Sequence, residues 1–190
     1  MSHNHIVTDI PTHDIAINEE GARQYLRSHG HPEGFIEGFI KNAEHVPIRF
    51  FICDDSGSMM ETDGKRLVKS KSGLTRSVVC SRWEELRDTI TFHAELASAS
   101  NSISEFRFLN GPYSIVIGDS ERDPDRVGMR QLTKKLEGGP AGATPLCAHI
   151  NAIIMQIRDA ELRLRQANQV ACIVICTDGM SSDGNVVDAM

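Results

Sequence analysis

The sequence has no apolar run that approaches the roughly 18 residues of a membrane-spanning helix. Its first residues, MSHNHIVTDIPTHD, also lack the basic segment and the apolar core of a secretory signal. We therefore expect a cytoplasmic protein without a membrane span. The composition, 190 residues of which 40% are hydrophobic and 24% charged, suits one sizeable soluble domain, alone or with a small appendage.

An excess of basic residues is also missing. Lys and Arg number 20 against 26 Asp and Glu, which gives a net charge of −6 spread along the chain. A dedicated nucleic-acid-binding protein would present a basic face, so no nucleic-acid partner is expected. The five cysteines are an odd number, and most lie in apolar surroundings, which favours reduced, buried thiols in an intracellular protein.

A short apolar segment that ends in carboxylates and hydroxyls is the most informative stretch, residues 48–60, IRFFICDDSGSMM. Its β-branched and aromatic residues predict a strand at 48–53 that is buried on both faces, as in a parallel sheet. Open α/β sheets bind ligands at the carboxyl ends of such strands. Asp54, Ser56 and Ser58 alternate, so their oxygens converge in an extended turn, and hard oxygen donors suit Mg²⁺ or Mn²⁺. The alternative is a loop that caps a following helix.

Amphipathic helices alternate with apolar strands along most of the chain. We predict helices at 18–30, 32–43, 81–99, 123–137 and 145–164, and further strands at 104–109, 113–117 and 170–176. This alternation indicates an α/β fold with a doubly wound, mostly parallel, Rossmann-like sheet flanked by helices.

The chain divides by composition into three parts and one insert. Residues 1–16 are expected to be a flexible N-terminus, 17–46 a helical extension too small to stand alone, and 47–190 the main domain on which it packs. The insert at 61–80 carries five basic and two acidic residues and leaves from the rim of the predicted site. A Lys-Ser-Gly turn at 71–73 predicts a β-hairpin there, with a flexible surface loop as the alternative.

The last apolar strand also ends in polar residues, Thr177-Asp178-Gly179. Adjacent central strands of a doubly wound sheet present their carboxyl ends on one edge, so Asp54 and Asp178 would face the same crevice. Thr144, in a Gly-rich loop before a helix, is the natural third contributor. Taken alone, Thr144 would be a helix cap and Asp178 an Asx-turn residue.

Together these residues resemble the von Willebrand factor A (vWA) domain and its metal-ion-dependent adhesion site (MIDAS). That family carries D-x-S-x-S after its first strand, a Thr in a loop before a helix, and an Asp after its fourth strand. The positions of this sequence that match are Asp54, Ser56, Ser58, Thr144 and Asp178. The resemblance covers roughly residues 47–188.

The resemblance implies that Ser56 and Ser58 bind Mg²⁺ or Mn²⁺ through their hydroxyls. It implies direct or water-mediated binding by Thr144, and largely water-mediated binding by the two aspartates. Such an ion keeps much of its charge and an exchangeable position, which a partner carboxylate can fill. The predicted function is therefore an intracellular protein-binding module whose protein partner supplies an acidic residue. Asp55 would point away from the ion.

Two other functions stay open at this point. One is a Mg²⁺-dependent phosphoryl transferase or hydrolase, since Asp54-Asp55 at a strand end superficially resembles the haloacid dehalogenase phosphatases. Those enzymes need a second Asp two positions after the nucleophile, where this chain has Ser56 or Gly57. No persuasive nucleophile–base pair stands out either, so we expect no enzyme and assign no catalytic residue. The other is a structural vWA-like domain with a vestigial metal site.

The sequence departs from the vWA pattern in two places. The basic insert at 61–80 separates the Asp/Ser loop from the helix that usually follows it closely. The family also continues for two more strands after the last Asp, whereas the sequence given stops at Met190, so 170–176 would form an apolar edge. We expect a truncated piece, an edge covered by a partner or by the N-terminal helices, or a reduced variant.

Overall fold

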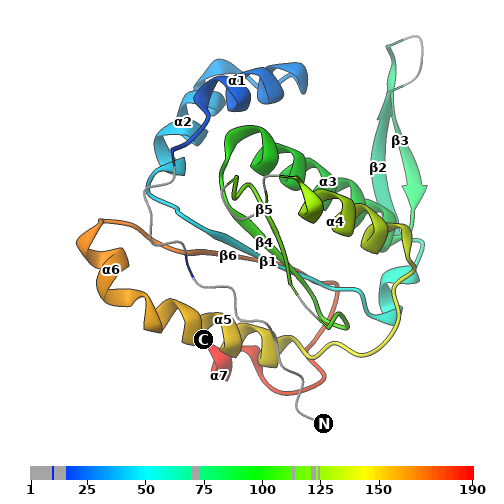
Figure 1. The fold of residues 1–190 in the computed structure, drawn as a ribbon. Helices are drawn as coiled ribbons and strands as arrows, with labels where there is room; N and C mark the ends of the chain where they lie inside the picture. Colours follow the sequence, from blue (N-terminus) through cyan, green and yellow to red (C-terminus); the bar gives the residue numbers. More distant parts are fainter. Residues whose placement is uncertain (1–9, 11–15, 70–72, 113, 121–122, 124) are drawn as a thin grey trace.

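The computed structural model describes residues 10, 16–69, 73–112, 114–120, 123 and 125–190 (Figure 1). The elements in chain order are α1 (Glu19–Ser28), α2 (Glu33–Ala43), β1 (Arg49–Cys53), the 3₁₀-helix η1 (Gly57–Met60), β2 (Gly64–Lys69), β3 (Thr75–Cys80), α3 (Arg82–Ser100), β4 (Ser104–Phe108), β5 (Ser114–Ile117), α4 (Val127–Glu137), α5 (Leu146–Asp159), α6 (Glu161–Gln166), β6 (Cys172–Cys176) and α7 (Val186–Ala189). Most of the predicted flexible N-terminus, 1–9 and 11–15, and the predicted turn residues 71–72 lie outside the described residues.

A four-stranded sheet with the order β5-β4-β1-β6 forms the centre of the fold. β1 runs parallel to β4 and to β6, and β5 is antiparallel to β4. This sheet confirms the predicted α/β class with mostly parallel strands and flanking helices. Because β1 and β6 are paired in parallel with Cys53 opposite Cys176, the polar loops that follow them begin side by side.

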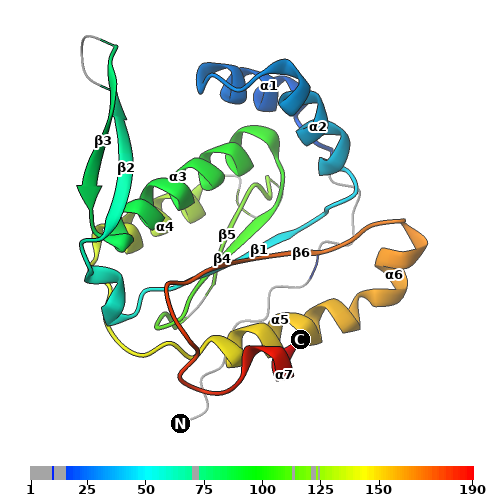
Figure 2. The same cartoon turned by 180° about the vertical axis from the view of Figure 1, so that it is seen from behind.

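Two hydrophobic layers cover the sheet, one on each face (Figure 2). Phe51 and Cys53 of β1 pack in the layer formed with α3 and α4, whereas Phe50 and Ile52 pack in the layer formed with α5. All four side chains are at most 2% exposed, which confirms the predicted burial of this strand on both faces. This double burial contributes about 1.5–3 kcal/mol for each large side chain and fixes the end of β1 rigidly.

The strand predicted at 170–176 is an edge strand, as expected where no further strand follows it in the sequence given, and it is less buried than β1. All five residues of β6 are only half-buried, because β6 lies at the edge of the sheet and pairs with β1 on one side. An apolar run of this length is typical of a buried strand, yet its composition does not distinguish a central strand from an edge strand.

The N-terminal helices pack on the main domain, as predicted. The Asn18 side chain caps α1 by accepting a hydrogen bond from the Gly21 N–H, at 3.0 Å. Leu26 of α1 and Ile36 of α2 are fully buried in a small cluster that includes Leu96 of α3. The second helix starts one residue later than predicted, since Pro32 is its N-cap and not its first residue.

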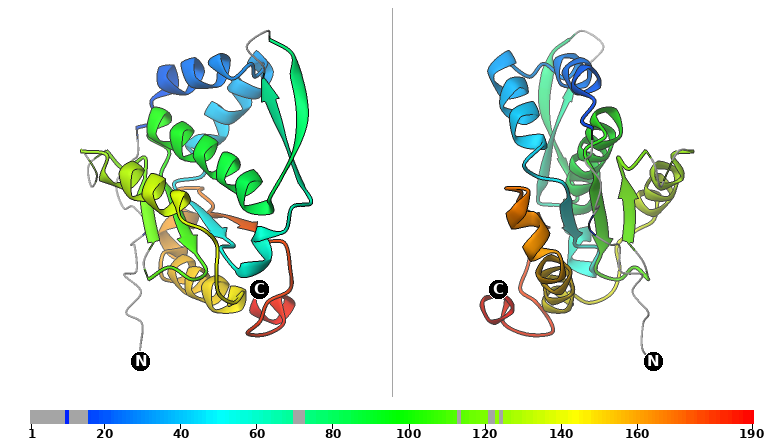
Figure 3. Two further views of the ribbon diagram at one scale, coloured as in Figure 1. Left: turned by 90° about the vertical axis from the view of Figure 1, so that its right-hand side faces the viewer. Right: turned by 60° about the vertical axis from the view of Figure 1, so that its left-hand side comes forward.

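The basic insert forms the β-hairpin β2–β3, which stands apart from the sheet as a two-stranded ribbon (Figures 1 and 3). Its inner face leans on α3, where Arg66 lies 3.7 Å from Glu84 and 3.6 Å from Asp88. Ser81 follows the hairpin directly and caps α3 in a complete capping box with Glu84. The hairpin is thus joined to a rigid helix terminus.

Two predicted helix boundaries differ from the structure. The helix expected from residue 123 begins at Val127, and the Asp123 carboxylate instead accepts hydrogen bonds from the Val127 and Gly128 N–H groups. The helix expected over 145–164 divides into α5 and α6 around Ala160. Within the described residues, no helix is both long and apolar enough to cross a membrane.

Candidate metal centre

The loops after β1 and β6 are joined directly at the carboxyl edge of the sheet. The Asp54 N–H donates to the Cys176 carbonyl at 2.9 Å, which extends the strand pairing by one residue. The Thr177 hydroxyl donates to Asp54 Oδ2 at 2.7 Å, and the Ser56 N–H donates to Asp54 Oδ1 at 2.9 Å. Both carboxylate oxygens of Asp54 are thereby held in place.

A chain of hydroxyl and carboxylate oxygens leads from the first loop to the second. Ser56 Oγ and Ser58 Oγ lie 3.1 Å apart, and the Ser58 hydroxyl donates to Asp178 Oδ1 at 3.0 Å. Ser56 is buried and Ser58 is exposed, so the chain runs from the interior to the surface. Of the three side chains predicted to converge, Ser56 and Ser58 are joined by their hydroxyls and reach Asp178. The Asp54 carboxylate instead accepts from the Ser56 N–H and the Thr177 hydroxyl and, among the described residues, bonds neither serine hydroxyl.

Asp54 is a fully buried carboxylate that has no cation beside it in the part of the chain that the structure describes. Its side chain is 0% exposed, and the donors that reach it within the described part of the chain, the Ser56 N–H and the Thr177 hydroxyl, are neutral. A buried carboxylate is normally paired with a cation or bound to a metal. Asp54 is therefore the carboxylate that a bound cation would stabilise most.

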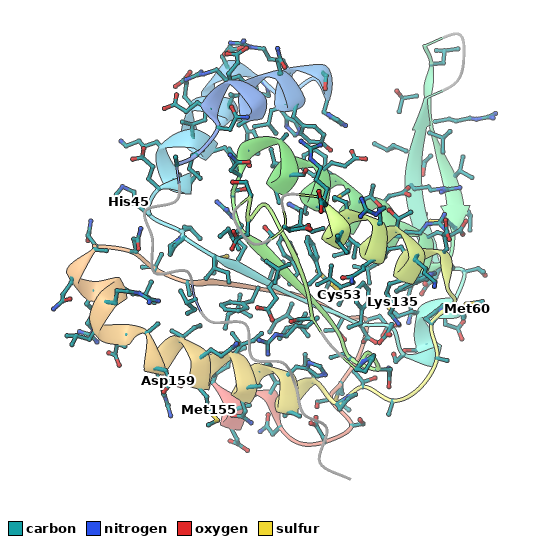
Figure 4. The ribbon with its side chains drawn as sticks, in the orientation of Figure 1. His45, Cys53, Met60, Lys135, Met155 and Asp159 are labelled. Carbon is teal, nitrogen blue, oxygen red and sulfur yellow. The ribbon has the colours of Figure 1, made fainter. Side chains whose placement is uncertain are left out.

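The neighbouring Asp55 is directed away from this group, as predicted, and is neutralised. Its Oδ2 accepts from Lys135 Nζ of α4 at 2.7 Å, and its Oδ1 accepts from the Asn110 N–H at 2.8 Å. Figure 4 labels Lys135 together with Cys53, the last residue of β1, at this end of the sheet. Asp55 thus ties β1 to α4 and to the loop after β4, and does not contribute to the site.

The Gly-rich loop that carries Thr144 is tied to the Asp/Ser loop through its backbone. The Gly57 N–H donates to the Gly142 carbonyl at 3.2 Å, and the Ala141 N–H donates to the Asp55 carbonyl at 2.7 Å. Gly142 has a φ of +108°, and a Cβ there would lie 2.4 Å from Asn110 Oδ1, so no other residue fits.

Thr144 joins the site less directly than the other four predicted residues. Its carbonyl accepts from the Ser182 N–H at 2.8 Å, which ties it to the loop after β6. Among the described residues, no hydrogen bond links its side chain to Asp54, Ser56, Ser58 or Asp178. Side-chain bonds therefore join Ser56, Ser58 and Asp178, the Asp54 carboxylate joins them through the Ser56 backbone N–H, and Thr144 is held at the rim by its backbone.

Arg82, the first residue of α3, is a site residue that the sequence did not indicate. Its Nη1 donates to Asp178 Oδ2 at 2.7 Å, and its Nε and Nη2 donate to the two oxygens of Asp63 at 2.7 and 2.5 Å. The hydrogen bonds that Arg82 donates to Asp63 and then to Asp178 raise the pKa of Arg82, and the Arg82 guanidinium lowers the pKa of Asp63. Asp178 is thus shared between a hydroxyl and a guanidinium.

Asp183 completes the loop after β6 by capping α5. Its carboxylate accepts from the Cys147 N–H at 3.0 Å and from the Ala148 N–H at 2.8 Å, and the Ser181 hydroxyl also donates to it. Desolvation raises the pKa of this group, but the hydrogen bonds from Ser181 and the two backbone N–H groups outweigh it, so the pKa of Asp183 lies below its ordinary value. This cap holds the second loop against the helix that follows Thr144.

Replacement of Asp183 by alanine is expected to cost about 1 kcal/mol of unfolding free energy at pH 7, because α5 loses its N-terminal acceptor. Since the folded state lowers the pKa of Asp183, its contribution is present above the unfolded pKa of about 3.9 and is lost as the pH falls through the lower folded value. Urea unfolding of both proteins at pH 7 and at low pH measures this. An equal difference at both values would contradict the assignment.

The donor set suits a hard divalent cation. The side-chain atoms that converge are hydroxyl and carboxylate oxygens, the ligands that Mg²⁺ and Mn²⁺ prefer. The described residues contain no group of three or more His, Cys, Asp or Glu side chains placed to hold a metal. Burial raises the pKa of the adjacent Cys53 and Cys176 thiols, so these groups stay neutral. Any ion held here would depend on the serine hydroxyls together with Asp54 and Asp178.

Comparison of the chain with protein-family models, with curated proteins and with solved structures found no match in any of the three. The functional assignment therefore depends on the residues and contacts of this chain alone.

Proposed function

We propose that this protein is a metal-dependent protein-binding module, in which Mg²⁺ or Mn²⁺ at the ends of β1 and β6 ligates a carboxylate of a protein partner. The observation that carries the proposal is the buried Asp54 carboxylate, whose donors among the described residues are the neutral Ser56 N–H and Thr177 hydroxyl. A divalent cation supplies the missing positive charge.

The residues present fit such an ion. By the vWA resemblance, Ser56 and Ser58 would bind it through their hydroxyls, with Thr144 at the rim, and Asp54 and Asp178 would act largely through water. The strand order supports this placement, because Asp54 follows the first strand of the main sheet and Asp178 follows its fourth strand in sequence. When bound, the cation would offer an exchangeable coordination position to an incoming carboxylate.

The hairpin favours an acidic partner. It begins directly after Asp63, beside the site, and carries exposed Lys65 and Arg76. Leu67 and Val79 on its outer face are 76% and 67% exposed, a level unusual for large apolar side chains. A partner that brings a carboxylate to the ion would therefore meet a basic and partly apolar ribbon beside it.

A glutamate-rich peptide is expected to bind in the presence of Mg²⁺ and to lose binding when EDTA is added, because the ion provides the carboxylate contact. The Lys65→Ala/Arg76→Ala variant should bind it up to about fivefold more weakly for each lost charge. Raising the ionic strength from about 0.1 to 1 M, which shortens the Debye length from about 10 to 3 Å, should weaken it further. Fluorescence anisotropy of a labelled peptide measures all three effects.

The matched control is Lys41→Ala/Arg158→Ala, which removes two exposed cations from α2 and α5. This variant should bind the peptide as the native protein does. Peptide binding that is unchanged by EDTA would contradict the proposed role of the ion.

A further inference from the structure

Arg82 lies where a cation is intrinsically unfavourable. It is the first residue of α3, a 19-residue helix, and the positive end of a helix dipole disfavours a cation in the first turn. Two carboxylates from separate loops nevertheless hold it there, Asp63 with two hydrogen bonds and Asp178 with one. Its backbone N–H also donates to the Glu61 carbonyl at 2.9 Å. The guanidinium is therefore fixed between the site and the base of the hairpin.

Arg82 bonds one carboxylate oxygen of Asp178, Oδ2, while the other, Oδ1, faces the Ser58 hydroxyl that would bind the ion. Asp178 is only 10% exposed in its side chain, and its two oxygens are taken by the Ser58 hydroxyl and by Arg82. Asp55 is likewise satisfied by Lys135. Within the described ranges, the carboxylates of Asp178 and Asp55 each have a cation of the protein itself, and that of Asp54 has none.

We propose that Arg82 is a built-in counter-ion of Asp178 that competes with the divalent cation and thereby lowers the affinity of the site. This inference deepens the proposed function and rests on it, because it concerns regulation of the same site. When the ion binds, Asp178 would interact with the metal and its water, and its interaction with the Arg82 guanidinium would weaken. Asp63 gives Arg82 a second anchor, so the guanidinium stays at the base of the hairpin when Asp178 releases it.

This arrangement couples the ion to the hairpin. Asp63 lies in the turn that enters β2, and Arg82 begins the helix that follows β3, so both ends of the hairpin connect to the same guanidinium. A partner that draws Arg82 toward the hairpin with its own carboxylate would raise the affinity for the ion, and the ion would raise the affinity for that partner to the same extent.

The test is titration of Mg²⁺ into metal-free native protein and into Arg82→Gln, followed by calorimetry. Removal of a like charge within a few ångströms of the ion is expected to tighten binding about tenfold or more. Arg82→Lys keeps the charge without the planar fork and should change the affinity by less than about threefold from the native value. If Arg82→Gln does not fold, Arg82→Lys is measured in its place, and an affinity changed by more than about threefold would then contradict the role of the charge.

Arg87→Gln is the matched control, because it removes the same charge from the same helix about 7.5 Å further along its axis. It should leave the affinity within about twofold of the native value, since the added distance and solvent reduce its effect. Thermal unfolding with EDTA establishes that each variant is folded.

The outcomes separate this inference from the proposed function. Binding by the native protein that becomes tighter in Arg82→Gln, and not in Arg87→Gln, supports the inference. Native protein that binds Mg²⁺ with an affinity that Arg82→Gln leaves unchanged or weakens overturns the inference and leaves the proposed function standing. Absence of binding in all folded variants overturns both.

Discussion

Asp54→Asn is expected to abolish the stabilisation that Mg²⁺ confers while leaving the metal-free protein folded. At a concentration one hundred times the dissociation constant, a ligand that binds only the native state adds about 2.7 kcal/mol to its stability. The variant should gain less than about 0.5 kcal/mol under the same conditions, because the buried negative charge that attracts the ion is gone. Thermal unfolding with EDTA and with Mg²⁺ measures both quantities.

The metal-free variant should stay within about 1 kcal/mol of the native protein. Asparagine keeps an oxygen to accept from the Ser56 N–H, and it removes a buried charge that has no cation beside it. The fold therefore loses little when the charge is removed.

Asp55→Asn serves as the control, because it is expected to lower the stability of the protein and to keep the stabilisation by Mg²⁺. This change breaks the partly buried pair with Lys135, so it should destabilise the protein with and without Mg²⁺ while the increment from Mg²⁺ persists. A native-like Mg²⁺ increment in Asp54→Asn would show that the buried carboxylate is not what the ion binds.

A second large effect is expected at the ion pair of β4. Glu105 is 0% exposed and Arg107 is 7% exposed, with Arg107 Nε 2.5 Å from Glu105 Oε1 and the Gln156 side chain also bound to the guanidinium. Glu105→Ala leaves the Arg107 charge buried without its partner, which typically costs about 3–5 kcal/mol. The midpoint of urea unfolding measures the loss.

Replacement of both residues by methionine should recover most of that loss, because a well-packed apolar pair often equals or exceeds a buried ion pair in stability. Glu33→Ala breaks the exposed pair with Arg27, where Nε lies 2.7 Å from Oε1, and should leave the midpoint of urea unfolding nearly unchanged because solvent screens this pair. A double variant as unstable as Glu105→Ala would mean that lost packing, and not the unpaired charge, sets the cost.

The sequence predicted the helices and strands that are determined by residues close together in the chain. The apolar run before Asp54 predicted β1, and the helix predicted from residue 81 is α3, which Ser81 caps together with Glu84. The parallel arrangement followed from strands that alternate with helices. It placed Asp54 and Asp178 at one edge of the sheet, where the Ser58 hydroxyl now links the two loops.

The features that the sequence did not predict depend on contacts between distant segments. Arg82 and Asp178 are 96 positions apart, and Lys135 and Asp55 are 80 apart, so no local pattern pairs them. The sequence feature that could have indicated the role of Arg82 is its position in the first turn of α3. A cation there is disfavoured by the helix dipole unless carboxylates lie nearby.

The most direct test of the metal assignment is calorimetric titration of Mg²⁺, and then of Mn²⁺, into metal-free native protein and into Ser56→Ala/Ser58→Ala. Saturable binding at one site in the native protein, lost in the double variant while its fold persists, is the predicted result. Absence of both binding heat and a thermal shift, in native protein shown to be folded, would contradict it.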